Sequence, residues 1–321
     1  MSNFSNRLVL NEFIYSLFGK EQFAYFQKEL IDEEEGFNAA GHSNYYKKIK
    51  RIMGPDLNFF RDKSHKDNLR KLKEYDSNIR EYQKRLNAKR NKKIKFKYFQ
   101  YISLLFSEIY LDKYFSNREK LLEEYKRFLD KTNKEMKNKG RDEYYTEIQD
   151  YLNKIAYWMA TGSGKTLLMH ANFWQFLHYN NEDIDNVILI TSNEGMSKQH
   201  IEEMEKSNIS CDFFQQDKSE KDLKTVEVID IHKLEEESGD KTVDVDSFEG
   251  NNLVFIDEGH KGFSGDKWLS RKREVVSNGF VFEYSATYGQ ALSSSNNKDL
   301  IEEYSHSILF YYSFKNFHED G

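Results

Sequence analysis

The residues best suited to chemistry form a glycine-rich turn near the middle of the chain, from Ala160 to Thr166, with the sequence ATGSGKT. An apolar run precedes this turn and a helical pattern follows it. Glycines let backbone N–H groups face phosphate oxygens, because no Cβ stands in the way, and the positive end of the next helix points at the same phosphates. Lys165 would reach the β and γ phosphates of ATP, and the Thr166 hydroxyl would hold Mg²⁺. We therefore predict an ATP and Mg²⁺ site formed by Thr161, Gly162, Ser163, Gly164, Lys165 and Thr166.

Two acids follow a second apolar run, LVFIDEGH, 92 residues after Lys165. At a strand end, Asp257 would enter the Mg²⁺ shell opposite Thr166, and Glu258 would polarise the attacking water as a general base. Ligands bind at the carboxyl ends of parallel strands, where these acids would lie. Alone, the pair is also typical of an ordinary strand exit. We assign His260 a coupling role from its position, and the alternative is a hydrogen-bonded loop histidine.

A third apolar run ends in the sequence EYSAT, residues 283–287. Ser285 and Thr287 carry short hydroxyls that can hydrogen-bond the acidic motif and move with the γ phosphate. We therefore predict a coupling role for both residues. As isolated residues they would be ordinary turn formers.

These three motifs need strands and helices to position them. From about residue 150 onward, short apolar runs alternate with helical stretches, which predicts a parallel sheet covered on both faces. The first 140 residues are helical in pattern over 9–18 and 98–129, and 131–143 has the composition of a polar linker. The expected strands are 155–159, 187–190, 226–231, 253–256 and 279–284, and the expected helices between them are 166–179 and 197–206.

The composition excludes several classes of protein. Apolar residues make up 38% of the 321 residues, too many for a disordered chain. A single cysteine, Cys211, excludes a disulfide framework and a multi-cysteine metal site. No apolar run approaches the roughly 20 residues of a membrane helix, and the N-terminus has no signal-peptide core. We expect a cytoplasmic protein with no membrane partner.

Charge is unevenly distributed along the chain. Residues 44–140 hold 28 Lys and Arg against 13 Asp and Glu, whereas residues 141–321 hold 17 against 34. The basic segment, residues 89–97 (KRNKKIKFK), is the densest part. Such clusters neutralise phosphates, so we predict nucleic-acid contacts from Lys92 and Lys93. The alternatives are a solvated helix face or a surface that packs on the acidic half.

In this order, ATGSGKT, DEGH and SAT resemble the first motor lobe of the DEAD/DEAH-box (superfamily 2) helicases, and most closely the branch of type III restriction enzyme R subunits and UvrB-like proteins. The resemblance covers about residues 150–310. It implies an α/β fold with a RecA-like P-loop NTPase lobe, a parallel sheet flanked by helices, over 146–310. A mostly helical, basic N-terminal domain would occupy 1–145, and 311–321 would begin a connector to a missing second lobe.

Further residues take roles only through this resemblance. Thr191, Ser192 and Gln199 resemble residues that touch the nucleic-acid backbone, residues 228–234 resemble the next such strand, and Gln149 resembles an adenine-reading glutamine. For both strands the alternative is an ordinary strand and helix cap. Two positions depart from the family: Met159 replaces the first glycine of the strict phosphate-loop pattern, and Gly259 replaces an alanine, which leaves the subfamily open.

The resemblance implies the ATP-binding lobe of a DNA-acting helicase or translocase of restriction or defence type, with double-stranded DNA as the favoured track. A modification or nuclease subunit would be a further partner. The second lobe of such motors supplies arginines worth about 10³ to 10⁵ in rate, so we expect weak hydrolysis by this chain alone. The alternatives are a nucleotide-switched half-motor without turnover and another P-loop NTPase, against which the SAT sequence argues. A nuclease site at residues 54–56 is disfavoured, because no (D/E)xK follows closely.

Overall fold

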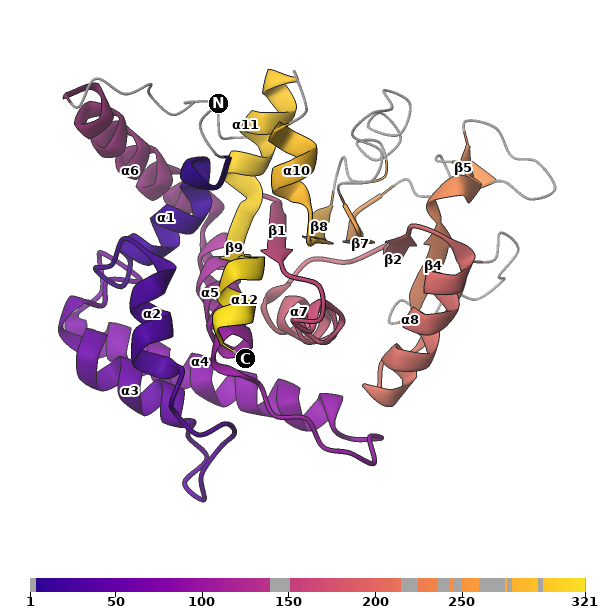
Figure 1. Cartoon of the computed structure of the whole chain (residues 1–321), viewed down its shortest axis with the longest axis horizontal. Coiled ribbons are helices and arrows are strands. Elements are labelled where there is room, and N and C mark those ends of the chain that lie inside the picture. Colours follow the sequence, from indigo (N-terminus) through magenta and orange to yellow (C-terminus); the bar gives the residue numbers. More distant parts are fainter. Residues whose placement is uncertain are drawn as a thin grey trace.

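The structure is a computed structural model that describes residues 4–138, 151–214, 225–235, 243–244, 250–259, 275, 279–293 and 297–320. Its centre is a seven-stranded sheet in the order β3-β4-β2-β7-β8-β1-β9, in which all neighbouring strands are parallel. The predicted α/β fold with a parallel sheet is thereby confirmed (Figure 1). The strands are β1 (Lys154–Met159), β2 (Asn186–Thr191), β3 (Cys211–Phe213), β4 (Val226–Asp230), β7 (Asn252–Asp257), β8 (Phe280–Ser285) and β9 (Ile308–Tyr312), with a separate short pair formed by β5 (Leu234–Glu235) and β6 (Val243–Asp244).

Helices cover both faces of the sheet, because side chains alternate between the faces along each strand. On one face, Tyr157, Phe255 and Phe282 join the main core with α5 and α7. On the other face, Ala156 packs with residues of α10 and α11. The helices of this half are α7 (Lys165–Tyr179), α8 (Glu194–Lys206), the 3-10 turn η4 (Ile231–Lys233), α10 (Tyr288–Ser293), α11 (Lys298–Ser307) and α12 (Phe314–Glu319).

The N-terminal region is helical, as predicted, and it packs directly on the sheet layer. Helix α5 is buried at every position from Tyr98 to Lys113, and it contacts α4, α7 and β9. The hydrophobic core therefore runs without a break from the N-terminal helices into the sheet. This region contains η1 (Phe4–Arg7), α1 (Val9–Ser16), α2 (Phe23–Leu30), α3 (Asn44–Met53), η2 (Gly54–Asp56), α4 (His65–Leu86), α5 (Tyr98–Ser116) and α6 (Arg118–Asn138).

Three details differ from the sequence prediction. The helical stretch expected over 98–129 is two helices, which separate at Asn117. The linker expected over 131–143 is helical as far as Asn138, where α6 ends, because Lys, Glu and Met are good helix formers and no glycine occurs before Gly140. Strands β3 and β9 were not predicted, and they form the two edges of the sheet, beside β4 and β1 respectively.

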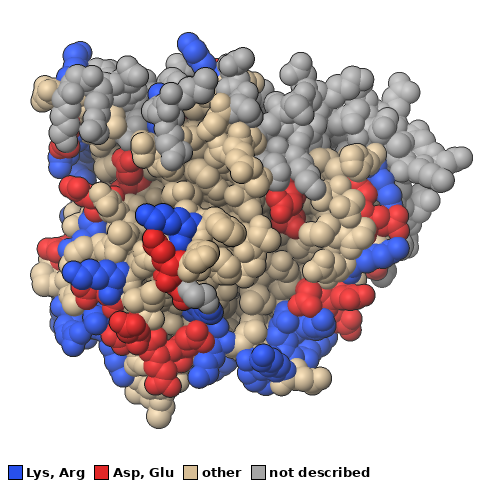
Figure 2. Space-filling model, viewed as in Figure 1, with Lys and Arg blue, Asp and Glu red and all other residues tan. Residues whose placement is uncertain are grey.

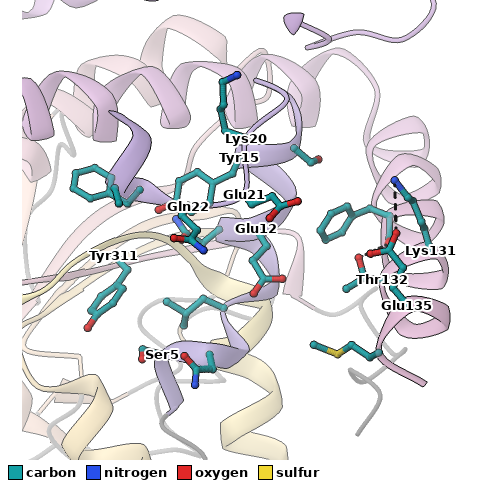
Figure 3. A pocket seen from close by; sticks show the side chains of 18 of the residues that line it. Ser5, Glu12, Tyr15, Lys20, Glu21, Gln22, Lys131, Thr132, Glu135 and Tyr311 are labelled. Carbon is teal, nitrogen blue, oxygen red and sulfur yellow. Dashed lines mark hydrogen bonds and ion pairs between the residues drawn. The ribbon is translucent and has the colours of Figure 1, made fainter. Parts of the chain in front are cut away.

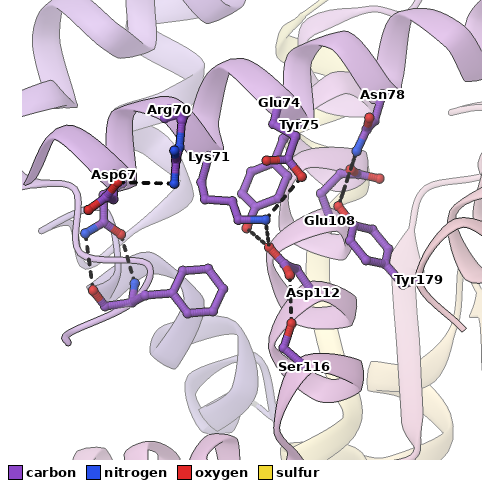
Figure 4. A network of polar contacts seen from close by, with 12 residues as sticks. Asp67, Arg70, Lys71, Glu74, Tyr75, Asn78, Glu108, Asp112, Ser116 and Tyr179 are labelled. Carbon is purple, nitrogen blue, oxygen red and sulfur yellow. Dashed lines mark hydrogen bonds and ion pairs between the residues drawn. The ribbon is translucent and has the colours of Figure 1, made fainter. Parts of the chain in front are cut away.

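A buried polar network joins α4, α5 and α7 (Figure 4). The carboxylate of Glu108 on α5 accepts hydrogen bonds from Asn78 (2.8 Å), Gln175 (2.7 Å) and Tyr179 (2.7 Å). Burial raises the pKa of Glu108 to about 7 even though these donors favour the charged form. Lys71 of α4 also forms an ion pair with Asp112 of α5 at 2.9 Å. These contacts fix α5 against the helix that follows the glycine-rich turn.

Candidate nucleotide and nucleic-acid site

The glycine-rich turn joins β1 to α7, as the sequence predicts. Gly162 and Gly164 have φ values of +81° and +90°, a region that favours glycine. The turn is braced from inside, because the Ser163 hydroxyl donates to the Ala160 carbonyl at 2.7 Å. The Lys165 ammonium folds back toward the Met159 carbonyl at 3.4 Å. The loop is therefore a closed turn at the carboxyl end of β1, with α7 beginning at Lys165.

Two elements outside the motif support this turn. Gln100 of α5 donates its amide N–H to the Ser163 carbonyl at 2.8 Å. A Cβ on Gly164 would lie 2.4 Å from the Gln100 amide nitrogen, so the side chain fills the space that glycine leaves. Phe317 of α12 lies on the other side, 3.6 Å from where a Cβ on Gly162 would stand. Sequence reasoning missed both residues, since neither belongs to a recognisable motif.

The acidic motif lies at the same edge of the sheet as this turn, with β8 between β7 and β1. In their register, Asp257 is opposite Tyr284, which is opposite Tyr157. One carboxylate oxygen of Asp257 accepts from His200 Nε2 at 2.9 Å, and the other accepts from the backbone N–H of Glu258 at 3.0 Å. Asp257 is thus held firmly at the strand end.

His200 is the third residue that sequence reasoning missed. It lies on α8 and is buried with Ser197, Met204 and Ser207, at the spacing of one helix face. A histidine on the inward face of a helix that follows a motif strand is the signal that would have identified it. The neighbouring Gln199, which was predicted instead, is exposed.

Backbone geometry at the acidic motif is unusual. Glu258 has a φ of +56°, a left-handed conformation that costs a non-glycine residue about 1–3 kcal/mol. The next residue, Gly259, donates its N–H to the Tyr284 carbonyl at 3.0 Å. A Cβ on Gly259 would stand 2.7 Å from the Tyr288 hydroxyl and 2.8 Å from the Glu283 carboxylate. Gly259, which replaces the alanine of the family pattern, is therefore required because the Tyr288 and Glu283 side chains leave no room for a Cβ.

The third motif forms a turn after β8. The Ser285 hydroxyl accepts from the Thr287 backbone N–H at 3.0 Å. The Thr287 hydroxyl is buried, and it has no hydrogen-bond partner among the residues that the structure describes. The SAT motif thus follows β8, the strand that lies between β7, which ends in the acidic motif, and β1, which leads into the glycine-rich turn. His260 and Gln149 lie outside the described residues.

The predicted nucleic-acid residues are divided between buried and exposed positions. Thr191 is 1% exposed, and its hydroxyl is 2.6 Å from that of Ser197. Ser192 is also buried, whereas Lys92 and Lys93 are exposed. Figure 2 shows Lys and Arg side chains gathered over the loop after α4, beside the acidic residues of α8. The contacts of these residues within the described part of the chain do not show what any of them binds.

The donor groups present fit ATP and Mg²⁺. Positive-φ glycines and the first turn of α7 offer N–H groups to phosphates. Magnesium is usually held by one or two carboxylates together with phosphate oxygens and waters. Asp257 and the Thr166 hydroxyl supply such a set, and no cluster of three or more His, Cys, Asp or Glu suited to a metal occurs among the described residues.

A separate cavity of about 930 Å³ lies between α1, the start of α2, and α6. Figure 3 shows Glu12, Tyr15 and Gln22 on one side of it, and Lys131 and Glu135, which are 3.9 Å apart, on the other. None of the predicted site residues lines this cavity.

Comparisons with known proteins agree with the motifs. Residues 77–290 match the family described as "Type III restriction enzyme, res subunit". The match begins within α4, so it includes α5 and α6 as well as the motif strands. No curated protein matches the chain, and no helix among the described residues is long and apolar enough to cross a membrane. The chain belongs to the type III restriction enzyme res subunit family, and its matched residues correspond to a superfamily 2 helicase first-lobe domain, which is a helicase-type ATP-binding lobe.

Proposed function

We propose that this chain is the ATP-binding lobe of a DNA-acting helicase or translocase of restriction or defence type. The observation that supports this function best is the sheet order, in which β7, β8 and β1 place the acidic motif, the SAT turn and the glycine-rich turn side by side. Duplex DNA is the favoured track, and a second motor lobe and a modification or nuclease subunit are the expected partners. The helices over 1–145 would form an accessory unit packed on the lobe over 146–310, with 311–321 leading toward the second lobe.

The proposed mechanism assigns one task to each group. Backbone N–H groups of residues 161–166 bind the phosphates of ATP, and Lys165 neutralises their charge. Thr166 and Asp257 would hold Mg²⁺, which offsets the negative charge that develops on the phosphates. Glu258 would accept a proton from the attacking water. Ser285, Thr287 and His260 would transmit the state of the γ phosphate to DNA contacts at Thr191, Ser192 and Gln199.

Replacing Lys165 by Ala is the first test. We expect loss of nucleotide binding, because the variant removes the only side-chain cation of the glycine-rich turn. The measurement is ATP hydrolysis with and without duplex DNA, together with binding of a fluorescent ATP analogue. The proposal would be refuted if the wild type hydrolysed ATP no faster than the Lys165→Ala blank and did not bind the nucleotide. Binding without turnover would indicate a nucleotide-switched half-motor instead.

The basic segment is the proposed DNA surface. Five of its six cations are exposed, while Arg90 is bound to Glu203 on α8 at 3.1 Å. We expect Lys92→Glu with Lys93→Glu to weaken duplex binding and to lower the slope of log K against log salt by roughly 1 for each lost phosphate contact. Lys131→Glu, an equally exposed charge reversal on α6, is the control. An unchanged salt slope would indicate that the basic segment is a solvated surface that does not contact DNA.

A further inference from the structure

The carboxylate of Asp257 is held by the side chain of His200, a residue to which the family match assigns no role. His200 Nε2 lies 2.9 Å from one oxygen of Asp257, and both side chains are at most 9% exposed. The other oxygen accepts from the Glu258 backbone. Because the second hydrogen bond comes from Asp257's own strand end, His200 is the contact that ties Asp257 to another element, α8.

The same helix is held at its far end by the loop after α4. Arg90 donates to the Glu203 carboxylate at 3.1 Å and to the Ser207 hydroxyl at 2.9 Å. The Ser207 hydroxyl in turn lies 2.8 Å from His170 Nδ1 on α7. Arg90 thus ties the end of α8 to the basic segment, and Ser207 ties it to α7.

His200 lies on the helix whose end Arg90 holds. Ser207 follows His200 by seven residues, which is two turns on the same face of α8. The helix therefore connects Arg90 with the residue that holds Asp257.

We propose that α8 positions the magnesium-binding carboxylate from the basic segment: Arg90 holds Glu203 and Ser207 at one end of the helix, and His200, on the same helix, holds Asp257. His200 is a positioning residue that acts through Asp257. This inference rests on the proposed function, and it adds a physical connection between the basic segment and the nucleotide site.

The test compares His200→Leu with His200→Gln. Loss of a partner that orients a metal ligand typically costs about 10–100-fold in metal affinity or activity. We expect His200→Leu to raise the Mg²⁺ concentration for half-maximal binding of a fluorescent ATP analogue by about 10-fold, and to lower kcat. Nucleotide binding in EDTA should not change. His200→Gln keeps an amide donor for Asp257, and we expect it to restore most of the Mg²⁺ response. Equal impairment of the two variants would overturn the proposal.

Arg90→Met tests the contacts at the far end of α8 without touching the nucleotide site. We expect a smaller shift in the same direction, and less than additive effects when it is combined with His200→Leu. Lys84→Met, an exposed cation on α4 bound only to Glu81 among the described residues, is the matched control. Absence of nucleotide binding by the wild type would refute the proposed function. Normal binding with an unchanged Mg²⁺ response in every variant would refute only the positioning of Asp257 through α8.

Discussion

Replacing Glu258 by Gln is expected to leave ATP binding intact and to lower hydrolysis by about 10² to 10⁴. The amide has nearly the same shape as the carboxylate but cannot accept the proton of the attacking water. Binding is preserved because the phosphate-binding groups lie on β1 and α7, whereas Glu258 follows β7. The measurement is single-turnover hydrolysis of radiolabelled ATP, alongside equilibrium binding of the nucleotide.

A matched control for this variant is Glu205→Gln, which changes an exposed acid on α8 in the same way. It should hydrolyse ATP at the wild-type rate. If Glu258→Gln hydrolysed ATP at the rate of this control, Glu258 would not be the general base. Loss of ATP binding in Glu258→Gln would instead show that its left-handed backbone conformation shapes the site.

Replacing Lys154 by Met is expected to lower the free energy of unfolding by about 3–5 kcal/mol, because it removes the ammonium group that neutralises a buried carboxylate. Lys154 Nζ lies 3.0 Å from Glu283, forms a second ion pair with Glu303, and lies 3.8 Å from the centre of the Tyr304 ring. Glu283 is completely buried, so water cannot replace the lost ammonium. Denaturation by urea, followed by circular dichroism, measures the change.

Two further variants make this result specific. Lys198→Met removes a solvent-exposed partner of Glu194, and we expect a change of about 0–1 kcal/mol. Adding Glu283→Gln to Lys154→Met removes the charge of that carboxylate and should recover part of the loss. If Lys154→Met were no less stable than Lys198→Met, the buried pair would contribute nothing to stability.

The sequence predicted most of the sheet because its strands are short β-branched or aromatic runs bounded by turns. Strands β1, β2, β4, β7 and β8 were found within one or two residues of their ends. Strand β9 was missed because Ile308–Tyr312 follows α11 directly, without a turn residue to mark its start. The fold class and the family followed from the order of three local motifs, and both are confirmed.

The site could be predicted only where its residues are consecutive. The glycine-rich turn and the acidic pair are each continuous in sequence, and their meeting follows from the general rule for strand ends. His200 and Gln100 reach the site across 57 and 63 residues, respectively, and a single sequence contains no record of such pairings. The roles of the predicted residues remain predictions that the variants above test.

The contact between the first helix and the last strand has a consequence for biosynthesis. Asn11 of α1 donates to the Leu309 carbonyl at 2.7 Å, across 298 residues. At about 5–20 residues per second, a ribosome needs roughly 15–60 s to make the chain between them. Throughout that interval the apolar face of α1 has no strand to cover it. Nascent chains of this protein should therefore depend on chaperones until β9 has left the ribosome.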